Sequence, residues 1–128
     1  MIFDTDILIW FFRGDLGAEE FIRIESERSI SIVSLMEFIQ GVRSQSEVKQ
    51  IRGFLVDNEI HILPISEPVS YLAATLVEDY TRSHGLGVSD ALIAATAREQ
   101  GATLATANIR YFRFISKLQL KKFRPSKS

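Results

Sequence analysis

Three acidic residues, Asp4, Glu37 and Asp90, lie beside predicted junctions between strands and helices. Asp4 directly follows the apolar run of residues 1–3. Glu37 lies in the first turn of a helix predicted after the second strand, and Asp90 in the first turn of a helix predicted before the fourth. In parallel sheets, reactive groups gather where the carboxyl ends of strands lead into helices. We therefore expect these carboxylates at one edge of one sheet, with Asp6 beside Asp4.

Each acid also has an ordinary structural explanation. Asp4 could cap a helix, and Ser34 followed by Glu37 matches a capping box. Asp90 stands where a carboxylate meets a helix dipole favourably. None of these explanations requires three acids to converge on one edge. Converging carboxylates repel and raise one another's pKa unless a cation lies between them, so a divalent metal is the natural resolution.

A metal in such a site must bind oxygen ligands. The chain has no cysteine, which excludes disulfides and thiolate sites, and its two histidines, His61 and His84, disfavour a zinc cluster. Carboxylates instead favour Mg²⁺, for which Mn²⁺ can substitute. A magnesium ion on carboxylates can generate a hydroxide and hold a phosphate oxygen, so phosphodiester hydrolysis suits this pattern best.

The hydrophobic pattern predicts strands that alternate with helices. The predicted strands are residues 1–3, 29–33, 59–65 and 102–106, with a short edge strand at 118–120, and the predicted helices are 5–12, 18–27, 34–41, 48–56, 68–84 and 89–100. This alternation predicts an α/β fold, in which a central, mostly parallel sheet of four to five strands is covered by helices on both faces.

Composition predicts a single domain spanning residues 1–128. The chain is 46% hydrophobic and 24% charged, which fits one compact unit with a proper core. No apolar stretch approaches the roughly 18 residues needed to cross a bilayer, and the N-terminus lacks the pattern of a signal peptide. We therefore expect a cytoplasmic protein that has no membrane partner.

The net charge of −1 hides an asymmetry along the chain. Residues 109–128 contain no acid, and their basic residues are Arg110, Arg113, Lys117, Lys121, Lys122, Arg124 and Lys127. An acidic body with a basic end indicates a surface that binds a polyanion. The alternative is a solvated terminal tail.

Four segments resemble, in order and spacing, the four motifs of PIN domains. They are DTDILIW (residues 4–10), SLMEFIQG (34–41), SDALIAATA (89–97) and LATAN (104–108). Each motif alone would be a weak signal, but the four together span essentially the whole chain. Within that group the chain is similar to the VapC-type toxin ribonucleases of toxin-antitoxin modules.

The resemblance implies a three-layer α/β/α sandwich that binds one or two Mg²⁺ ions and cuts RNA. The catalytic residues and metal ligands would be Asp4, Glu37 and Asp90. The residues beside them, which would support the ligands or contact substrate, would be Asp6, Ser34, Thr106 and Asn108. We further expect RNA contacts from Arg110, Arg113, Lys117, Lys121 and Lys122. The implied partners are RNA, a cognate antitoxin protein and a second copy of the chain in a homodimer.

One departure from the family keeps a second interpretation open. Many PIN domains place a fourth acid three residues after the asparagine, where this chain has Tyr111. The chain could therefore be a PIN-like module that binds RNA or protein with weak or no cleavage. The spacing of Asp4 and Asp6 is also similar to that of haloacid dehalogenase-type phosphatases, but the downstream residues which that family requires are missing.

Overall fold

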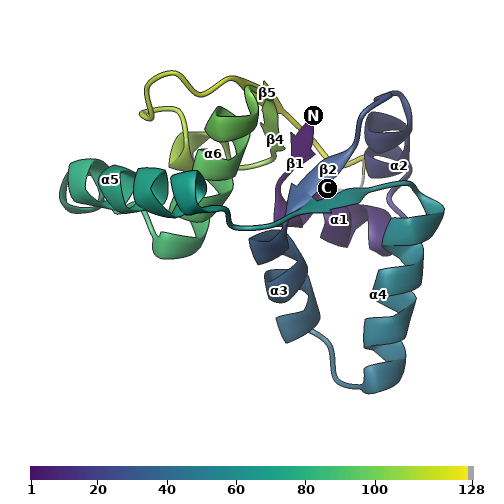
Figure 1. Cartoon of the computed structure of the whole chain (residues 1–128). Coiled ribbons are helices and arrows are strands. Elements are labelled where there is room, and N and C mark those ends of the chain that lie inside the picture. The colour runs from purple at the N-terminus through teal and green to yellow at the C-terminus, as the bar shows by residue number, and fades with distance from the viewer. Residues whose placement is uncertain (127–128) are drawn as a thin grey trace.

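The centre of the molecule is a five-stranded sheet (Figure 1). This computed structural model describes residues 1–126, so Lys127 of the basic segment lies outside the described residues. The strands are β1 (Ile2–Phe3), β2 (Ser29–Ser31), β3 (His61–Leu63), β4 (Leu104–Thr106) and β5 (Leu120–Lys122), in the order β3-β2-β1-β4-β5. Every neighbouring pair is parallel. The carboxyl ends of all five strands therefore form a single edge.

Helices cover both faces of this sheet. They are α1 (Thr5–Phe12), α2 (Leu16–Arg23), α3 (Ile32–Gln40), α4 (Gln45–Asp57), α5 (Glu67–His84) and α6 (Val88–Gln100), with a 3₁₀ turn, η1 (Ile109–Tyr111). In Figure 1, α5 and α6 lie on one side of the sheet and α1, α2 and α4 on the other. Within residues 1–126, no helix is both long and apolar enough to cross a membrane.

Two hydrophobic cores are separated by the sheet. Phe3 and Ala105 pack into the core formed with α1, α2 and α4. Their neighbours Ile2 and Leu104 pack into the core formed with α5 and α6. Successive residues of a strand point to opposite faces, so β1 and β4 contribute to both cores. The predicted three-layer α/β/α fold with a parallel sheet is confirmed.

Local caps fix where the helices begin and end. Ser31 accepts a hydrogen bond from the Val33 backbone N–H at 3.1 Å and so begins α3 directly after β2. Gly85 and Gly101 end α5 and α6 in the left-handed conformation, with φ of 70° and 62°, which glycine adopts without steric cost. The end of α5 at Gly85 is followed within three residues by the start of α6 at Val88, and Asp90 lies in the first turn of α6.

Several predicted boundaries were wrong. The second strand, predicted to run to residue 33, ends at Ser31, because the Ser31 hydroxyl caps the following helix. Glu37 consequently lies in the second turn of α3, and Ser34 is not a helix cap, so the capping-box explanation fails. Asp15 caps α2, which spans Leu16–Arg23 instead of the predicted 18–27. The edge strand predicted at 118–120 is instead Leu120–Lys122.

The third and fourth strands are also shorter than predicted. The sequence patterns predicted strands over residues 59–65 and 102–106. Only His61–Leu63 and Leu104–Thr106 pair in the sheet. Pairing is set by the neighbouring strand, and β2 offers three partners to β3. A hydrophobic pattern cannot show how long the neighbour is, which explains the difference.

Candidate active site

Asp4 lies at the junction of β1 and α1 and is 8% exposed. Its Oδ1 accepts a hydrogen bond from the Thr5 backbone N–H at 2.8 Å, which makes it the cap of α1. Its Oδ2 accepts one from the Thr106 hydroxyl at 2.7 Å. Thr106 is the last residue of β4, the strand beside β1. These two bonds fix the orientation of the carboxylate at the carboxyl edge of the sheet.

Asp6 is held by the loop that follows β4. Its Oδ2 accepts hydrogen bonds from the Ala107 backbone N–H at 3.1 Å and from the Asn108 side-chain amide at 3.0 Å. The Asn108 backbone N–H in turn donates to the Thr106 hydroxyl at 3.0 Å. The other oxygen of Asp6, Oδ1, is buried and has no hydrogen-bond partner among residues 1–126. One carboxylate oxygen is thus fixed while the other is unsatisfied.

Glu37 reaches the same edge from α3. Its Oε1 accepts a hydrogen bond from the Thr5 hydroxyl at 2.7 Å, which ties α3 to the start of α1. Ser34, one turn earlier on α3, is fully buried, and its hydroxyl has no partner among residues 1–126. Thr5 was not identified from the sequence. Its place directly after Asp4 was visible, but its partner lies 32 residues away and only the fold brings the two together.

Asp90 completes what we call the acid cluster: Asp4, Asp6, Glu37 and Asp90. Burial, followed by the charges of Asp4 and Glu37, raises the pKa of Asp90 to about 6. Burial, followed by the charge of Asp4, raises the pKa of Asp6 to about 7. Burial also raises the pKa of Asp4, despite the hydrogen bonds that it accepts. The structure therefore brings the predicted acids into electrostatic contact.

The acid cluster matches the chemistry of a hard divalent cation, because all its donors are oxygen atoms. Within residues 1–126, no three acidic or histidine side chains are placed so that they could together hold a metal ion as they stand. Two observations still fit a cation. Burial and then the neighbouring carboxylates raise the pKa values of Asp6 and Asp90, and the buried oxygens of Asp6 and Ser34 have no partner in the described part of the chain. A cation would relieve the repulsion and supply the missing partner.

Three of the predicted RNA-binding residues lie together beside this cluster. Arg110, Arg113 and Lys122 line a hollow of about 250 Å³ with Asn108 and its two neighbours, which we call the basic pocket. Lys122 ends β5 and is in register with Thr106 of β4, so the basic pocket lies at the carboxyl edge of the sheet.

The other two predicted RNA-binding residues do not line this pocket. Lys121, although adjacent to Lys122 in sequence, lies with its Nζ 3.5 Å from a carboxylate oxygen of Glu25 and 4.9 Å from the centre of the Phe21 ring. Lys117 is exposed in the loop before β5. The strand alternation separates Lys121 from Lys122, and the sequence alone treated them alike.

Tyr111 stands at the position where many PIN domains have a fourth acid, and in this chain it contacts the side chain of Arg110. Its side chain is 46% exposed. The Arg110 guanidinium lies 5.0 Å from the centre of its ring and donates a hydrogen bond to its hydroxyl at 3.1 Å. This contact favours an ordered position for Arg110 at the rim of the basic pocket.

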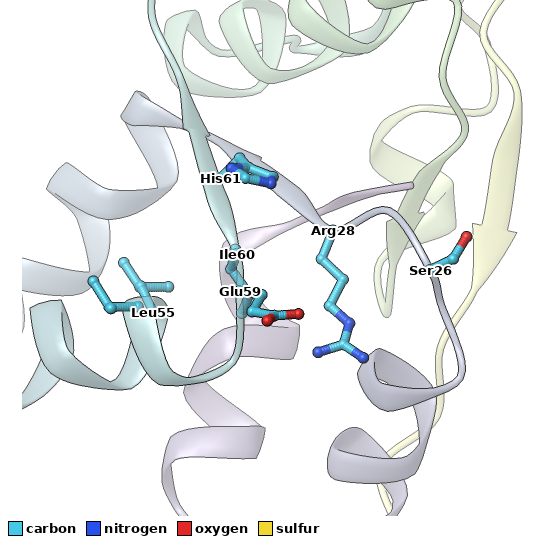
Figure 2. A pocket seen from close by; sticks show the side chains of 7 residues that line it. Ser26, Arg28, Leu55, Glu59, Ile60 and His61 are labelled. Atoms are coloured by element: carbon cyan, nitrogen blue, oxygen red, sulfur yellow. The ribbon is translucent and has the colours of Figure 1, made fainter.

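A larger cleft lies at the opposite edge of the sheet (Figure 2). It measures about 520 Å³ and is lined by Ser26, Arg28, Leu55, Val56, Glu59, Ile60 and His61. Its charged centre is structural, because Arg28 donates to the backbone carbonyls of Glu25, Asn58 and Arg23 at 2.8 to 2.9 Å. The acid cluster, rather than this cleft, is therefore the candidate active site.

Comparison with known proteins gives the family. Residues 1–117 match the PIN domain. Ribonuclease VapC10 of Mycobacterium tuberculosis is 32% identical over 123 residues, which cover 93% of this chain and 90% of that protein. Ribonuclease VapC1 of Rickettsia felis is 32% identical over 126 residues, which cover 94% and 93%. The chain belongs to the PIN domain family, and the resemblance inferred from its four motifs is confirmed.

Solved structures agree with this assignment. A toxin-antitoxin complex from Klebsiella pneumoniae contains a chain with a TM-score of 0.74 and 26% identity, with coverage of 91% of this chain and 93% of that one. VapBC2 from Rickettsia felis, solved bound to a DNA fragment from its promoter, gives a TM-score of 0.79 at 21% identity, with coverage of 97% and 100%. At that lower identity the likeness supports the shared fold.

Proposed function

We propose that this protein is a magnesium-dependent endoribonuclease and the toxin of a toxin-antitoxin module, acting in the cytoplasm. The observation that carries the proposal is the acid cluster, in which buried Asp4 and half-buried Asp6, Glu37 and Asp90 meet at one edge of the sheet. Burial first, and neighbouring carboxylates second, raise the pKa values of Asp6 and Asp90. Strongly raised pKa values in a cluster of this kind are typical of functional sites. The similarity to ribonucleases VapC supports RNA as the substrate.

Asp4, Glu37 and Asp90 would hold the metal, and Mn²⁺ would substitute for Mg²⁺. The bound ion would supply an activated water and neutralise charge on the phosphate. The protein fixes the ligands beforehand. Thr106 orients Asp4, and Thr5 orients Glu37, each through a 2.7 Å hydrogen bond. Such pre-set orientation lowers the reorganisation needed when substrate binds.

Asp6, Ser34 and Asn108 would support the ligands. The side-chain amide of Asn108 donates a hydrogen bond to Oδ2 of Asp6. The other oxygen of Asp6, Oδ1, has no partner within the described residues, and the Asp6 carboxylate lies close to the charges of Asp4 and Asp90. That oxygen can accept a hydrogen bond from a water molecule near the metal. The buried Ser34 hydroxyl can donate one in the same way.

The protein partners are proposed from the relatives. The Klebsiella pneumoniae structure is a toxin-antitoxin complex, and we infer that this chain also binds a cognate antitoxin protein. The homodimer expected from the family resemblance remains a prediction. A sedimentation measurement of the isolated chain tests it directly.

The proposal is tested by an RNA cleavage assay on the purified protein, with Mg²⁺ and with a chelator. We expect cleavage with Mg²⁺ and none with the chelator, and Asp4→Asn should abolish it. Asp57→Asn is a matched control, because Asp57 is an exposed aspartate at the end of α4. Metal-independent cleavage, or equal activity of Asp4→Asn and Asp57→Asn, would refute the proposal.

A second function is favoured by one feature, the tyrosine at position 111. With one acid fewer than many PIN domains, the chain could bind RNA or a protein partner without cutting. The same assay separates the two functions. RNA binding by wild type with no cleavage in Mg²⁺ or Mn²⁺ would favour the binding module.

A further inference from the structure

The basic pocket adjoins the acid cluster through one residue. Asn108 lines the basic pocket, and its side-chain amide donates to Asp6 at 3.0 Å. Lys122 enters the pocket from the end of β5, next to Thr106, whose hydroxyl holds Asp4. The pocket and the cluster are thus connected by short contacts along one sheet edge, with opposite charge on the two sides.

The cations of the basic pocket are free of acidic partners in the described part of the chain. Across residues 1–126, ion pairs form at Arg23 and Lys121, but none forms at Arg110, Arg113 or Lys122. Arg110 is positioned by the ring and hydroxyl of Tyr111. Three unpaired cations around a concave surface attract an anion more strongly than the same charges spread over a flat one. Arginine side chains also match the geometry of phosphate oxygens.

We propose that the basic pocket binds a backbone phosphate of the RNA that neighbours the phosphate being cut. The inference rests on the proposed ribonuclease function and deepens it. The acid cluster repels a polyanion, whereas cations on one flank hold the strand and fix its register over the carboxylates.

The strand alternation provides a matched pair for testing this inference. Lys122→Gln and Lys121→Gln each remove one positive charge from neighbouring positions of β5. Only Lys122 lines the basic pocket, while Lys121 contacts Glu25 and Phe21. An effect of net charge alone would be equal in the two variants, whereas a phosphate site would respond to one of them.

The first experiment measures binding of a single-stranded RNA oligonucleotide by fluorescence anisotropy at several salt concentrations, with chelator present to prevent cleavage. Lys122→Gln and Arg113→Gln should each reduce the slope of log affinity against log salt by about 0.7, the value for one lost phosphate contact on a single strand. Lys121→Gln should keep the wild-type slope. Equal slopes for Lys121→Gln and Lys122→Gln would overturn the proposal.

A polyglutamate peptide, titrated in the same way, distinguishes RNA from an acidic protein. If the Lys122→Gln and Arg113→Gln variants lose peptide binding and keep RNA binding, the pocket takes a protein partner and the proposal is wrong. Loss of RNA binding with no effect on peptide supports it.

The second experiment locates the phosphate during cleavage. RNA substrates that each carry one uncharged methylphosphonate linkage are cut with Mg²⁺ by wild type and by Lys122→Gln. We expect one linkage beside the cut site whose neutralisation slows wild type and has less effect in Lys122→Gln. The absence of any such linkage would overturn the register argument.

These experiments also separate failure of the inference from failure of the proposed function. If cleavage depends on magnesium but every variant keeps the wild-type salt slope, the phosphate site is refuted and the proposed ribonuclease function stands. If the variants show the expected salt slopes but the wild type does not cleave RNA, the phosphate site is supported and the proposed ribonuclease function is refuted.

Discussion

Asp15 and the acid cluster have opposite surroundings. Asp15, fully buried at the start of α2, accepts hydrogen bonds from the Ala18 backbone N–H at 2.9 Å and from the Ser126 backbone N–H at 3.1 Å. It also accepts one from the Ser126 hydroxyl at 2.6 Å. Asp90 has burial and the charges of Asp4 and Glu37 around it, all of which raise its pKa.

We interpret Asp15 as a structural charge and the acid cluster as the proposed functional one. Donors around Asp15 compensate its charge within the fold, so it caps α2 and fastens residue 126 to it. The acid cluster concentrates negative charge without enough donors, and this is the reason for our proposal that a metal ion completes it. Burial alone would have ranked Asp15 above Asp90, so the hydrogen-bond partners decide which aspartate is structural.

The largest expected effect is the loss of cleavage in Asp90→Asn. We expect a decrease of more than about 100-fold, since a catalytic metal contributes several kcal/mol and each 1.4 kcal/mol is about tenfold in rate. The free energy of unfolding should stay equal or increase, because like charges are relieved. Cleavage rates and urea unfolding measure both. Near-wild-type cleavage would remove Asp90 from the site.

Asp15→Ala should show the reverse pattern. Loss of the cap and of the buried hydrogen bonds should lower the free energy of unfolding by about 2 to 4 kcal/mol. Cleavage per folded molecule should stay close to wild type, because Asp15 belongs to the structural set. Urea unfolding and cleavage at low temperature test this. A variant that stays stable but loses cleavage would contradict the comparison.

Without metal, the acid cluster should make stability fall as pH rises from about 4 to about 7. The pKa values of Asp90, about 6, and Asp6, about 7, exceed the ordinary value of 3.8. The folded state therefore holds more protons than the unfolded state in this window, and linkage makes stability fall with rising pH. Unfolding measured in chelator should show a smaller fall for Asp90→Asn. Parallel curves for the two proteins would contradict the assigned pKa values.

Thr106→Val should have a smaller effect on the same cluster. It removes the 2.7 Å hydrogen bond to Asp4, leaving a buried carboxylate oxygen short of a donor at about 1 to 3 kcal/mol. Cleavage should fall by roughly tenfold, the equivalent of about 1.4 kcal/mol. Thr106→Ser restores the hydroxyl and should recover most of the rate. If serine fails to rescue, the methyl group matters and the hydrogen bond does not.

The sequence predicted the order of the elements and the acids at one edge because both depend on short-range patterns. Asp4 follows a strand, and the alternation of strands and helices requires a parallel sheet. The start of α3 was misplaced because both Ser31 and Ser34 are suitable caps, and only the end of β2 decides between them.

Other features of the site depend on contacts between distant residues. The hydrogen bond between Thr5 and Glu37 joins residues that are 32 positions apart in the sequence. The hydrogen bond between Asp15 and Ser126 joins residues that are 111 positions apart. The opposite environments of Lys121 and Lys122 follow from the register of β5, which its sequence does not specify. Composition could identify a basic end but could not show which of its side chains lie beside the acids.

The central claim, that the acid cluster needs a cation and Asp15 does not, is tested most directly by urea unfolding with and without Mn²⁺ at pH 7. We expect Mn²⁺ to stabilise wild type, by about 2.7 kcal/mol at a hundred times the dissociation constant, and to do the same for the exposed control Asp57→Asn. Asp90→Asn should lose most of this gain. No stabilisation of wild type, or equal stabilisation of Asp90→Asn, would contradict the account.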